Sequence, residues 1–397
     1  MRANARRVKS MPRASEQPKA PLVSVIMPAY NAEATIEETL NSVLAQTYTN
    51  IEVLVVDDGS QDRTAQIVES FAERDSRVLL IKQENAGLPA TRDRAIKEAT
   101  GDYVAPIDAD DIWHPQKLQK QVQCLLSAGP SVGLVYAWVV RIDEDDLILE
   151  AIDIQTKEDF GSVEGNVLPA LIYDNFVGCA SVPLIRRTCF KRVGGYSAPL
   201  KARNAQGCED WDIQLRIAEQ YEFRVVREFL VGYRQARTSM SRNVSAMARS
   251  YNLVMASFRP KHPEIPGYVY RLSRSNFALY LSQTSERGGA YATALGLALK
   301  AIRRDPVQLF LQAGYLLTTF FKLVLSSVGR WIGLNPLNWA RGIKRRLNRS
   351  RKEVPANHVA QLFDHRGPIH NARLDPVKRY GRIRWRRWLR ILEMCQR

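Results

Sequence analysis

The chain has 397 residues, of which 45% are hydrophobic and 25% charged, a composition typical of a globular protein and not of a disordered or fibrous one. Its length predicts two domains, or one large domain with an extension. The net charge of +16 is unevenly placed, because residues 1–20 hold six Lys/Arg against one Asp/Glu and residues 344–397 hold sixteen against four. The body between is nearly neutral, so the charge belongs to the tails, where it can serve binding to an anionic surface.

The five cysteines are odd in number and none stands in a Cys-x-x-Cys spacing. This pattern argues against a disulfide framework and against a structural zinc site, and it fits a reducing compartment such as the cytoplasm. Residues 1–20 are basic but lack the apolar stretch of a secretory signal peptide. We expect them to form a disordered leader.

Apolar runs of strand length alternate with helical patterns over residues 22–140. Strands are expected at 22–27, 51–56, 78–81, 102–107 and 132–140, and helices at 33–44, 64–71 and 88–99. This alternation predicts right-handed βαβ units and an α/β fold with a mostly parallel sheet. Residues 141–205 are mixed and give no clear assignment.

The second half of the chain favours helices. Residues 207–220 have the pattern of a turn followed by a helix, and residues 268–304 that of two helices joined at 287–289. The expected organisation is a leader, an α/β domain, a helical hairpin region, an apolar helix and a basic tail, over residues 1–20, 21–245, 246–305, 306–335 and 336–397.

Polar side chains follow three of the predicted strands. Tyr30-Asn31, Asp57-Asp58 and the tetrad Asp108-Ala109-Asp110-Asp111 each stand where a strand ends. In parallel α/β sheets, ligands bind outside the carboxyl ends of the strands. The coincidence of three such clusters predicts a binding site at that edge.

The tetrad is the most informative of these clusters. Three carboxylates crowded at a strand end repel one another and lose hydration, a cost that a divalent cation would offset. Mg²⁺ and Mn²⁺ take oxygen ligands, typically one or two carboxylates with the phosphates of a substrate. The structural alternative is that Asp110 or Asp111 caps a helix that begins near Pro115, although one aspartate would suffice for that.

Neither a Gly-x-Gly-x-x-Gly nor a Gly-x-x-x-x-Gly-Lys-Ser/Thr motif is present. The sequence therefore predicts neither a dinucleotide fingerprint nor a P-loop. If a nucleotide binds, we expect a metal ion to hold its phosphates.

The motifs and their order resemble glycosyltransferase family 2. The matching segments are Val23–Asn31, Val56–Ser60, Asn85–Gly87 with Arg92, Asp108–Asp111 and Glu209–Trp211. The resemblance covers roughly residues 20–240. It implies a Rossmann-like GT-A fold, a nucleotide-sugar donor, a divalent Mn²⁺ or Mg²⁺ ion, and inversion at the anomeric carbon.

The resemblance also implies roles for single residues. For the donor, Pro28 and Tyr30 would lie at the nucleotide, with Tyr30 against the base, and Asp58 would accept a hydrogen bond from the base, as expected for uracil in a UDP-sugar. Arg92 would face the diphosphate. Simpler alternatives exist for two of these residues, since Asp58 precedes a turn glycine and Arg92 could be a surface charge.

The remaining implied roles concern the metal, the base and a loop. Asp108 would contact the ribose or the metal shell, and Asp110 would ligate the metal. Asp210, or failing it Glu209, would be the general base, with a favourable helix N-terminus as the alternative explanation of these acids. The segment 238–243, which contains Arg242, resembles a family loop, and Arg242 would contact the diphosphate.

The chemistry needs these residue types. Loss of a nucleoside diphosphate develops negative charge that a metal stabilises, and inversion needs one carboxylate to take the proton of the acceptor hydroxyl. The Gln-x-x-Arg-Trp motif and the several membrane spans of processive family members are absent from the sequence. We therefore predict a hexosyltransferase that adds single sugars to a glycan or lipid-linked acceptor in cell-surface polysaccharide synthesis.

Two other functions fit parts of the sequence. The Arg-rich tail with Trp385 and Trp388 suits single-stranded nucleic acid, but the tail is small and the α/β body carries acids where phosphates would bind. A transferase-like protein without activity is disfavoured because the motif acids are intact. Nucleic acid is therefore an unfavoured partner.

The apolar segment 307–334 has three interpretations. It could be a packed helix, an interfacial helix that lies on a membrane and is flanked by Lys/Arg, or a membrane span. Lys322 and two glutamines inside it weigh against a span. The interfacial interpretation predicts an enzyme held peripherally on the cytoplasmic face of an anionic membrane.

Overall fold

A computed structural model describes residues 20–143, 163–196, 205, 207–235, 242–331, 387 and 389–396. The predicted segment with Trp385 and Trp388, the leader, and most of the basic tail lie outside these residues. The first half alternates strands and helices as expected. Its elements in chain order are β1 (Val23–Ala29), α1 (Ile36–Leu44), β2 (Ile51–Asp57), α2 (Thr64–Ala72), β3 (Val78–Lys82), α3 (Leu88–Glu98), β4 (Tyr103–Pro106), β5 (Ile112–Trp113), α4 (Lys117–Ser127) and β6 (Val132–Ile142).

The elements that follow include strands that the sequence pattern did not predict. They are α6 (Leu168–Tyr173), β7 (Leu184–Arg186), α7 (Arg187–Val193), α9 (Glu209–Ala218) and β8 (Glu222–Arg234). The strand β7 is short, and β8 carries charged residues on its exposed positions, so neither has the continuous apolar run that marks β1. Both are held by pairing with β6.

One eight-stranded sheet forms the centre of the molecule, in the order β3-β2-β1-β4-β7-β6-β8-β5. The pairs β3-β2, β2-β1, β1-β4 and β6-β8 are parallel, and the pairs made by β7 and β5 are antiparallel. The expected α/β class is confirmed, and the sheet is mixed with its parallel part at β3-β2-β1-β4. All seven residues of β1 are buried, as expected for a strand flanked on both sides.

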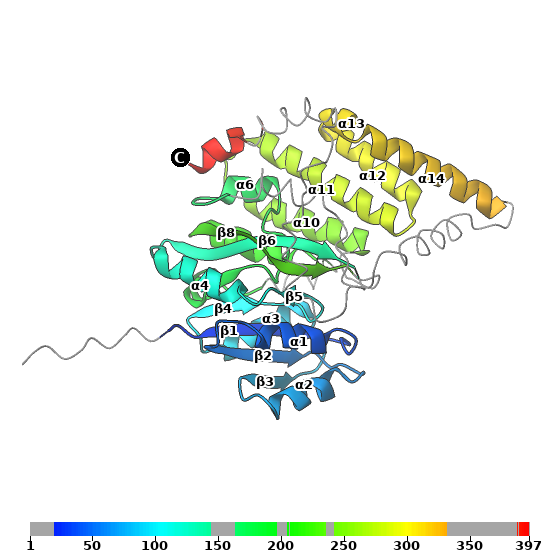
Figure 1. Cartoon of the computed structure of the whole chain (residues 1–397). Helices are drawn as coiled ribbons and strands as arrows, with labels where there is room; N and C mark the ends of the chain where they lie inside the picture. The colour runs from blue at the N-terminus through cyan, green and yellow to red at the C-terminus, as the bar shows by residue number, and fades with distance from the viewer. Residues whose placement is uncertain are drawn as a thin grey trace, which may run out of the picture.

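Helices form the region farthest from β3 (Figure 1). They are α10 (Val244–Phe258), α11 (Gly267–Arg287), α12 (Tyr291–Arg304), α13 (Val307–Leu311) and α14 (Ala313–Trp331), with a further short helix at 389–395. The two-helix prediction for 268–304 is confirmed by α11 and α12. One core cluster joins residues of the sheet to residues of α10 and α11, among them Tyr251, Phe258 and Leu281. The proposed domain boundary at 245 stays a prediction.

The sequence predicted one helix over the apolar segment, whereas the structure has two. The chain turns at Gln312, so α13 and α14 are separate helices. Within the described part of the chain, none of the helices combines the length and the hydropathy that a bilayer crossing requires.

Candidate active site

The three polar clusters come together because their strands are parallel neighbours. In the register of the sheet, Ala29 at the end of β1 lies beside Asp57 at the end of β2, and Ile26 lies beside Pro106 at the end of β4. The residues that follow these strands therefore leave the sheet at one edge. The three clusters therefore lie at one edge, as the sequence predicted, and the binding of a ligand there stays a prediction.

The turn after β4 is held from several sides. The hydroxyl of Ser181 accepts a hydrogen bond from the Asp108 amide at 2.9 Å and donates one to the Asp111 carboxylate at 2.5 Å. The Asp111 carboxylate also accepts a hydrogen bond from the Arg234 amide at 2.9 Å. Asp111 is fully buried, and burial raises its pKa well above its usual range. Asp111 thus supports the turn, a role that the sequence alone did not separate from that of its neighbours.

Arg234, the last residue of β8, clamps the same turn. Its Nε donates to the Asp110 carbonyl at 2.8 Å, and its Nη2 forms an ion pair with Glu38 of α1 at 2.7 Å. The side chain is buried, so these contacts are shielded from solvent. The clamp fixes the backbone of Asp110 relative to α1. It was missed because β8 itself was not predicted.

Asp110 is the residue that the sequence predicts as a metal ligand. Its carboxyl group is partly exposed, and burial followed by the charge of nearby Asp108 raises its pKa to about 7. A cation between Asp108 and Asp110 would relieve this repulsion. The described residues contain no group of three or more His, Cys, Asp or Glu that could hold a metal ion. Two carboxylates, Asp108 and Asp110, would suffice for a site in which phosphate oxygens of a ligand supply the remaining contacts to the cation.

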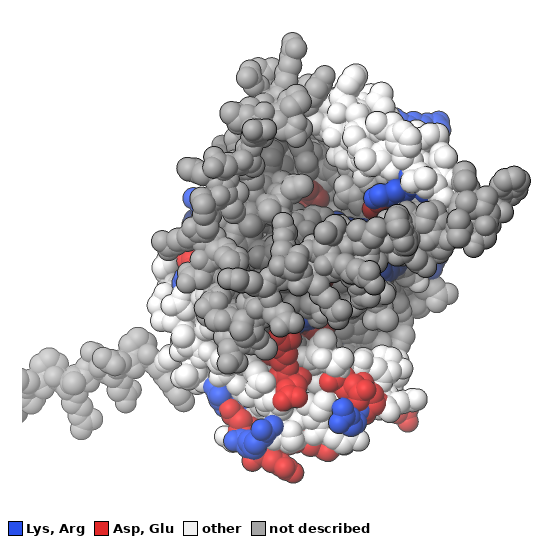
Figure 2. Space-filling model, turned by 45° about the vertical axis from the view of Figure 1, so that its right-hand side comes forward, with Lys and Arg blue, Asp and Glu red and all other residues white. Residues whose placement is uncertain are grey.

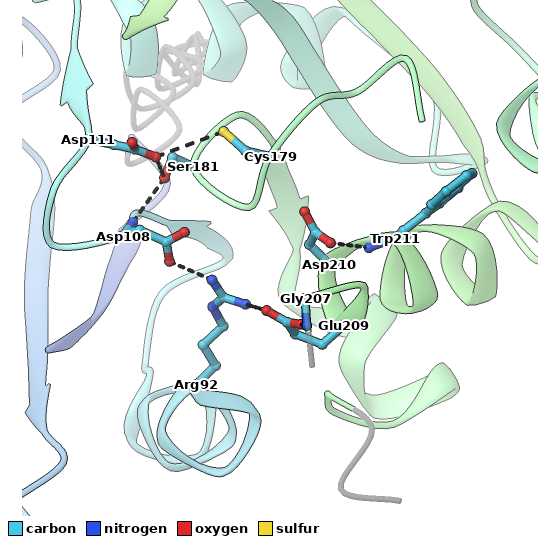
Figure 3. A network of polar contacts seen from close by, with 9 residues as sticks. All are labelled: Arg92, Asp108, Asp111, Cys179, Ser181, Gly207, Glu209, Asp210 and Trp211. Carbon is cyan, nitrogen blue, oxygen red and sulfur yellow. Dashed lines mark hydrogen bonds and ion pairs between the residues drawn. The ribbon is translucent and has the colours of Figure 1, made fainter. Parts of the chain in front are cut away.

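Arg92 connects the turn after β4 to α9 (Figure 3). Its guanidinium is 1% exposed and bridges Asp108 Oδ1 at 2.5 Å and Glu209 Oε1 at 3.0 Å. It also lies over the ring of Tyr196, 5.1 Å from the centroid. Arg92 is therefore a buried ion-pair centre and not a surface charge. It joins two acids that are separated by about a hundred residues of chain.

The two acids at the start of α9 differ in their surroundings. Glu209 uses one oxygen on Arg92 and the other on the Gly207 amide at 2.9 Å. Asp210 accepts a hydrogen bond from the Trp211 amide at 2.7 Å, its only hydrogen bond to the residues that the structure describes. Burial, and then the charge of Glu209, raises the pKa of Asp210 to about 7. One carboxylate oxygen of Asp210 therefore accepts no hydrogen bond from the described residues, whereas both oxygens of Glu209 do.

Asp210 and the turn after β4 belong to one site. The charge of Asp108 is among the causes that raise the pKa of Asp210, and the charges of both raise the pKa of the buried Tyr196 hydroxyl. In Figure 3 the Asp210 carboxylate stands across from Asp108, with Arg92 and Glu209 below them. Trp211 anchors this end of α9, since its indole N–H donates to the Leu171 carbonyl at 2.8 Å.

Asp58 differs from the simple turn residue that its sequence context allowed. Its buried carboxylate accepts hydrogen bonds from Gln83 at 2.7 Å and from the amides of Ala86 and Gly87, both at 2.8 Å. Asp58 therefore orders the segment that leads into α3. A contact between Asp58 and a nucleotide base stays a prediction.

The other predicted donor residues have separate surroundings. Pro28 is buried inside β1, whereas Tyr30 is 52% exposed beside the carboxyl edge of the sheet. Arg242 is exposed and stands next to Asn243, which caps α10 by accepting from the Ala246 amide at 3.0 Å. The segment 236–241 before it lies outside the described residues. The donor roles of these three residues stay predictions.

Comparisons with known proteins identify the family of this chain. The model of the family described as Glycosyl transferase family 2 matches residues 24–191. TuaG of Bacillus subtilis (strain 168), a glycosyltransferase named for teichuronic acid biosynthesis, is 30% identical over 226 residues, which are 56% of this chain and 82% of TuaG. The chain belongs to glycosyl transferase family 2.

A second relative is more similar over a shorter stretch. The UDP-Glc:alpha-D-GlcNAc-diphosphoundecaprenol beta-1,3-glucosyltransferase WfgD of Escherichia coli is 48% identical over 106 residues, 26% of this chain and 41% of WfgD. This chain matches 26% of the length of one further relative, EpsJ of Bacillus subtilis (strain 168), and 86% of the length of another, RT0329 of Rickettsia typhi. The mannosyltransferase PcManGT from Pyrobaculum calidifontis, solved with GDP-Man and Mn²⁺, is 21% identical with a TM-score of 0.49, covering 79% of this chain and 87% of that one.

With the family established, the protein is a glycosyltransferase. The predicted family and α/β fold are confirmed, and the predicted site acids Asp108, Asp110, Glu209 and Asp210 meet at one edge of the sheet. Their individual roles are proposals.

Proposed function

We propose that this glycosyltransferase moves a hexose from a nucleotide-diphosphate donor, a UDP-sugar, to a hydroxyl group with inversion at the anomeric carbon. The observation that carries the proposal is the Arg92 bridge, which brings Asp108 of the turn after β4 and Glu209 of α9 together and so sets Asp210 beside the candidate cation site. Electrophile and base would then meet in one place.

Asp110, with Asp108, would hold a divalent Mn²⁺ or Mg²⁺ ion. The raised pKa of Asp110 supports this role because a carboxylate that is crowded by its neighbour gains most from a cation. When bound, the ion supplies charge stabilisation to the departing diphosphate. Tyr30 and Asp58 would lie toward the nucleotide base, and Arg242 toward the diphosphate.

Asp210 is the proposed general base. As the acceptor oxygen bonds to the anomeric carbon and the bond to the diphosphate breaks, Asp210 takes the hydroxyl proton. A carboxylate with a pKa near the working pH suits this task better than one at its usual value. Glu209 is less suited, since both of its oxygens accept hydrogen bonds within the protein. Glu209 and Arg92 would position the site.

The acceptor is proposed to be a glycan or a lipid-linked glycan in cell-surface polysaccharide synthesis. The names of WfgD and TuaG, which refer to a diphosphoundecaprenol-linked acceptor and to teichuronic acid, support this class. An enzyme of that kind would work peripherally on the cytoplasmic face of the membrane.

A panel of nucleotide sugars tests the proposal. We expect the full chain to release a nucleoside diphosphate from one UDP-hexose, faster with a lipid-linked acceptor, and to stop when EDTA removes the metal. Full activity in excess EDTA would reject the metal assignment. Release from a GDP-sugar alone would reject the nucleotide while leaving the reaction class intact.

A further inference from the structure

Three polar side chains of α14 lie on the face that packs against the protein. Its Tyr315 hydroxyl hydrogen bonds with Ser282 of α11 at 2.8 Å, and its Lys322 ammonium forms an ion pair with Glu286 of α11. Thr319, between them on the same helical face, is fully buried. The lysine inside the apolar segment therefore pairs with α11, on the side of α14 that packs against the other helices.

The opposite face of α14 is exposed and apolar. Side chains at helical spacing cover it, each exposed by 41% to 58%: Leu317, Phe320, Phe321, Val324 and Leu325. Leu309 of α13, exposed by 47%, precedes them in the chain. We call these six residues the α13–α14 face. A helix on a soluble protein normally has the reverse arrangement, with its apolar stripe toward the core.

A patch of this kind marks an interaction surface. Figure 1 places α13 and α14 at the outer edge of the helical region, away from the sheet. In Figure 2 the described surface at the upper right of the molecule is mostly without charged side chains, with Lys or Arg side chains beside it. The residues of the candidate active site lie on other elements, so the proposed donor and metal roles do not account for this face.

The chain carries strong positive charge between the two ends of this surface. It leaves α14 at Trp331 and is next described at Arg387, whose guanidinium pairs with Asp305 at 2.7 Å, two residues before α13 begins. The intervening residues 332–386 hold fourteen Lys/Arg and three Asp/Glu. A basic chain that begins and ends at an exposed apolar surface matches the chemistry of an anionic lipid layer.

We propose that the α13–α14 face docks on an anionic membrane surface, with its phenylalanine and leucine side chains in the lipid–water interface. This proposal names the partner surface of the proposed function, since a lipid-linked acceptor would be met there, but membrane binding can be measured without turnover. The apolar part resists salt, whereas the electrostatic part weakens as the Debye length falls from ~10 Å at about 0.1 M salt to ~3 Å at about 1 M.

Co-sedimentation of the full chain with vesicles tests the proposal. We expect binding to phosphatidylglycerol-containing vesicles at low salt, weaker binding at high salt, and still weaker binding to phosphatidylcholine vesicles. The variant Leu317→Ser/Leu325→Ser removes two side chains that are exposed by 58% and 52%. It should bind at least about tenfold more weakly, and it should lose the salt-resistant part, because each leucine loses its transfer from water.

A matched control removes two equally exposed leucines elsewhere. Leu79 of β3 and Leu126 of α4 are exposed by 50% and 60%, and Leu79→Ser/Leu126→Ser should leave vesicle binding unchanged. Circular dichroism and melting curves check that both variants fold. Release of nucleoside diphosphate from a soluble donor should be the same in parent and variants.

Three outcomes overturn the proposal. The parent could remain in the supernatant with anionic vesicles at low salt. The Leu317→Ser/Leu325→Ser variant could bind vesicles as tightly as the parent, which would mean that residues 332–386 or another molecule cover the face. The variant could instead convert a dimer into a monomer in gel filtration without any change in vesicle binding, which would make the face a subunit interface. Vesicle binding without transferase activity would reject only the proposed function.

Discussion

The site at the sheet edge and the helix α14 break the usual distribution of side chains in opposite ways. At the sheet edge, Asp111, Glu209 and Arg92 are charged groups almost wholly removed from water. On α14, Phe320 and Phe321 are apolar groups exposed by 52% and 57%. Burying charge and exposing large apolar surface both cost free energy, so each region is organised for something other than stability alone.

The difference between the two regions indicates what kind of ligand or surface each would bind. Within the site, most acids have partners, such as the Arg92 bridge for Glu209 and the Ser181 hydroxyl for Asp111. Asp110 and Asp210 stand apart from them, with pKa values raised to about 7. Their complement is a cation and a transferable proton, whereas the complement of the α13–α14 face is lipid. Five changes would break or sharpen this comparison.

The largest effect is expected from Asp210→Asn. An amide cannot take the acceptor proton, so kcat should fall by about 10²–10⁴-fold with donor KM nearly unchanged. Asp212→Asn, two residues along α9, is the control, because Asp212 pairs with Arg216 at 2.8 Å and has no proposed catalytic role. Steady-state kinetics on both variants decide the matter. If Asp210→Asn turns over within a factor of a few, Asp210 is only a helix-terminus residue and Glu209 becomes the candidate.

Asp110→Asn should come next. Loss of a residue that only supports a metal ligand weakens metal binding by up to about 100-fold, so loss of the ligand itself should weaken Mn²⁺ binding by more than that. Activity and donor affinity should fall with it. Calorimetric titration of Mn²⁺ with UDP measures this directly. Asp102→Asn at the opposite end of β4, an exposed aspartate, should leave the affinity unchanged. Equal affinities for parent and Asp110→Asn would remove Asp110 from the site.

Substitution of Arg234 should have a smaller effect, because Arg234 would act only by positioning Asp110. Arg234→Ala removes the bond to the Asp110 carbonyl and the ion pair with Glu38, so Mn²⁺ affinity should fall by roughly 10–100-fold. Arg234→Lys keeps the charge and should recover part of the loss. A purely structural role would instead lower the melting temperature of Arg234→Ala and leave the Mn²⁺ affinity of the folded fraction as in the parent.

The stability of the metal-free protein should decrease with pH. The pKa values of Asp110 and Asp210 are raised in the folded state, so their protonated forms stabilise it fully below about 4, and this contribution is lost as pH rises through about 7. We expect the melting temperature to be lower at pH 8 than at pH 5 and Mn²⁺ to reduce the difference. In Asp110→Asn the dependence should be shallower and insensitive to Mn²⁺. A melting temperature that does not change across this range would contradict the assignment.

The smallest effect is expected from Phe320→Ser/Phe321→Ser. Both rings are more than half exposed, so the free energy of unfolding should change by about 0.5 kcal/mol or less per site, as for ordinary surface substitutions. Urea unfolding measures this change. By contrast, Phe258→Ser in α10 removes a ring that is 1% exposed and should destabilise by about 3–5 kcal/mol. A large loss of stability in the exposed pair would mean that the rings pack against part of this chain.

The first half of the fold could be predicted because its signals are local. The strands β1, β2 and β3 and the helix α2 begin within a residue of their expected positions, since short apolar runs and helical spacing decide them. The strands β7 and β8 could not be predicted, because their residues become strands by pairing with β6. Arg234 and Ser181 were missed with them. Nothing in the sequence near Ser181 signals that its hydroxyl supports the aspartate turn.

By itself, the sequence determined the family, the α/β class, and the acids at the strand ends and at Glu209-Asp210. These follow from local patterns, because residue type and spacing decide strands, helices and motifs. Only the tertiary structure decided which acids are paired, since Arg92 meets Asp108 and Glu209 through packing of α3 against the sheet and α9. It also decided which face of α14 points outward, because a helix exposes whatever side its neighbours leave uncovered, and here α11 binds the polar side.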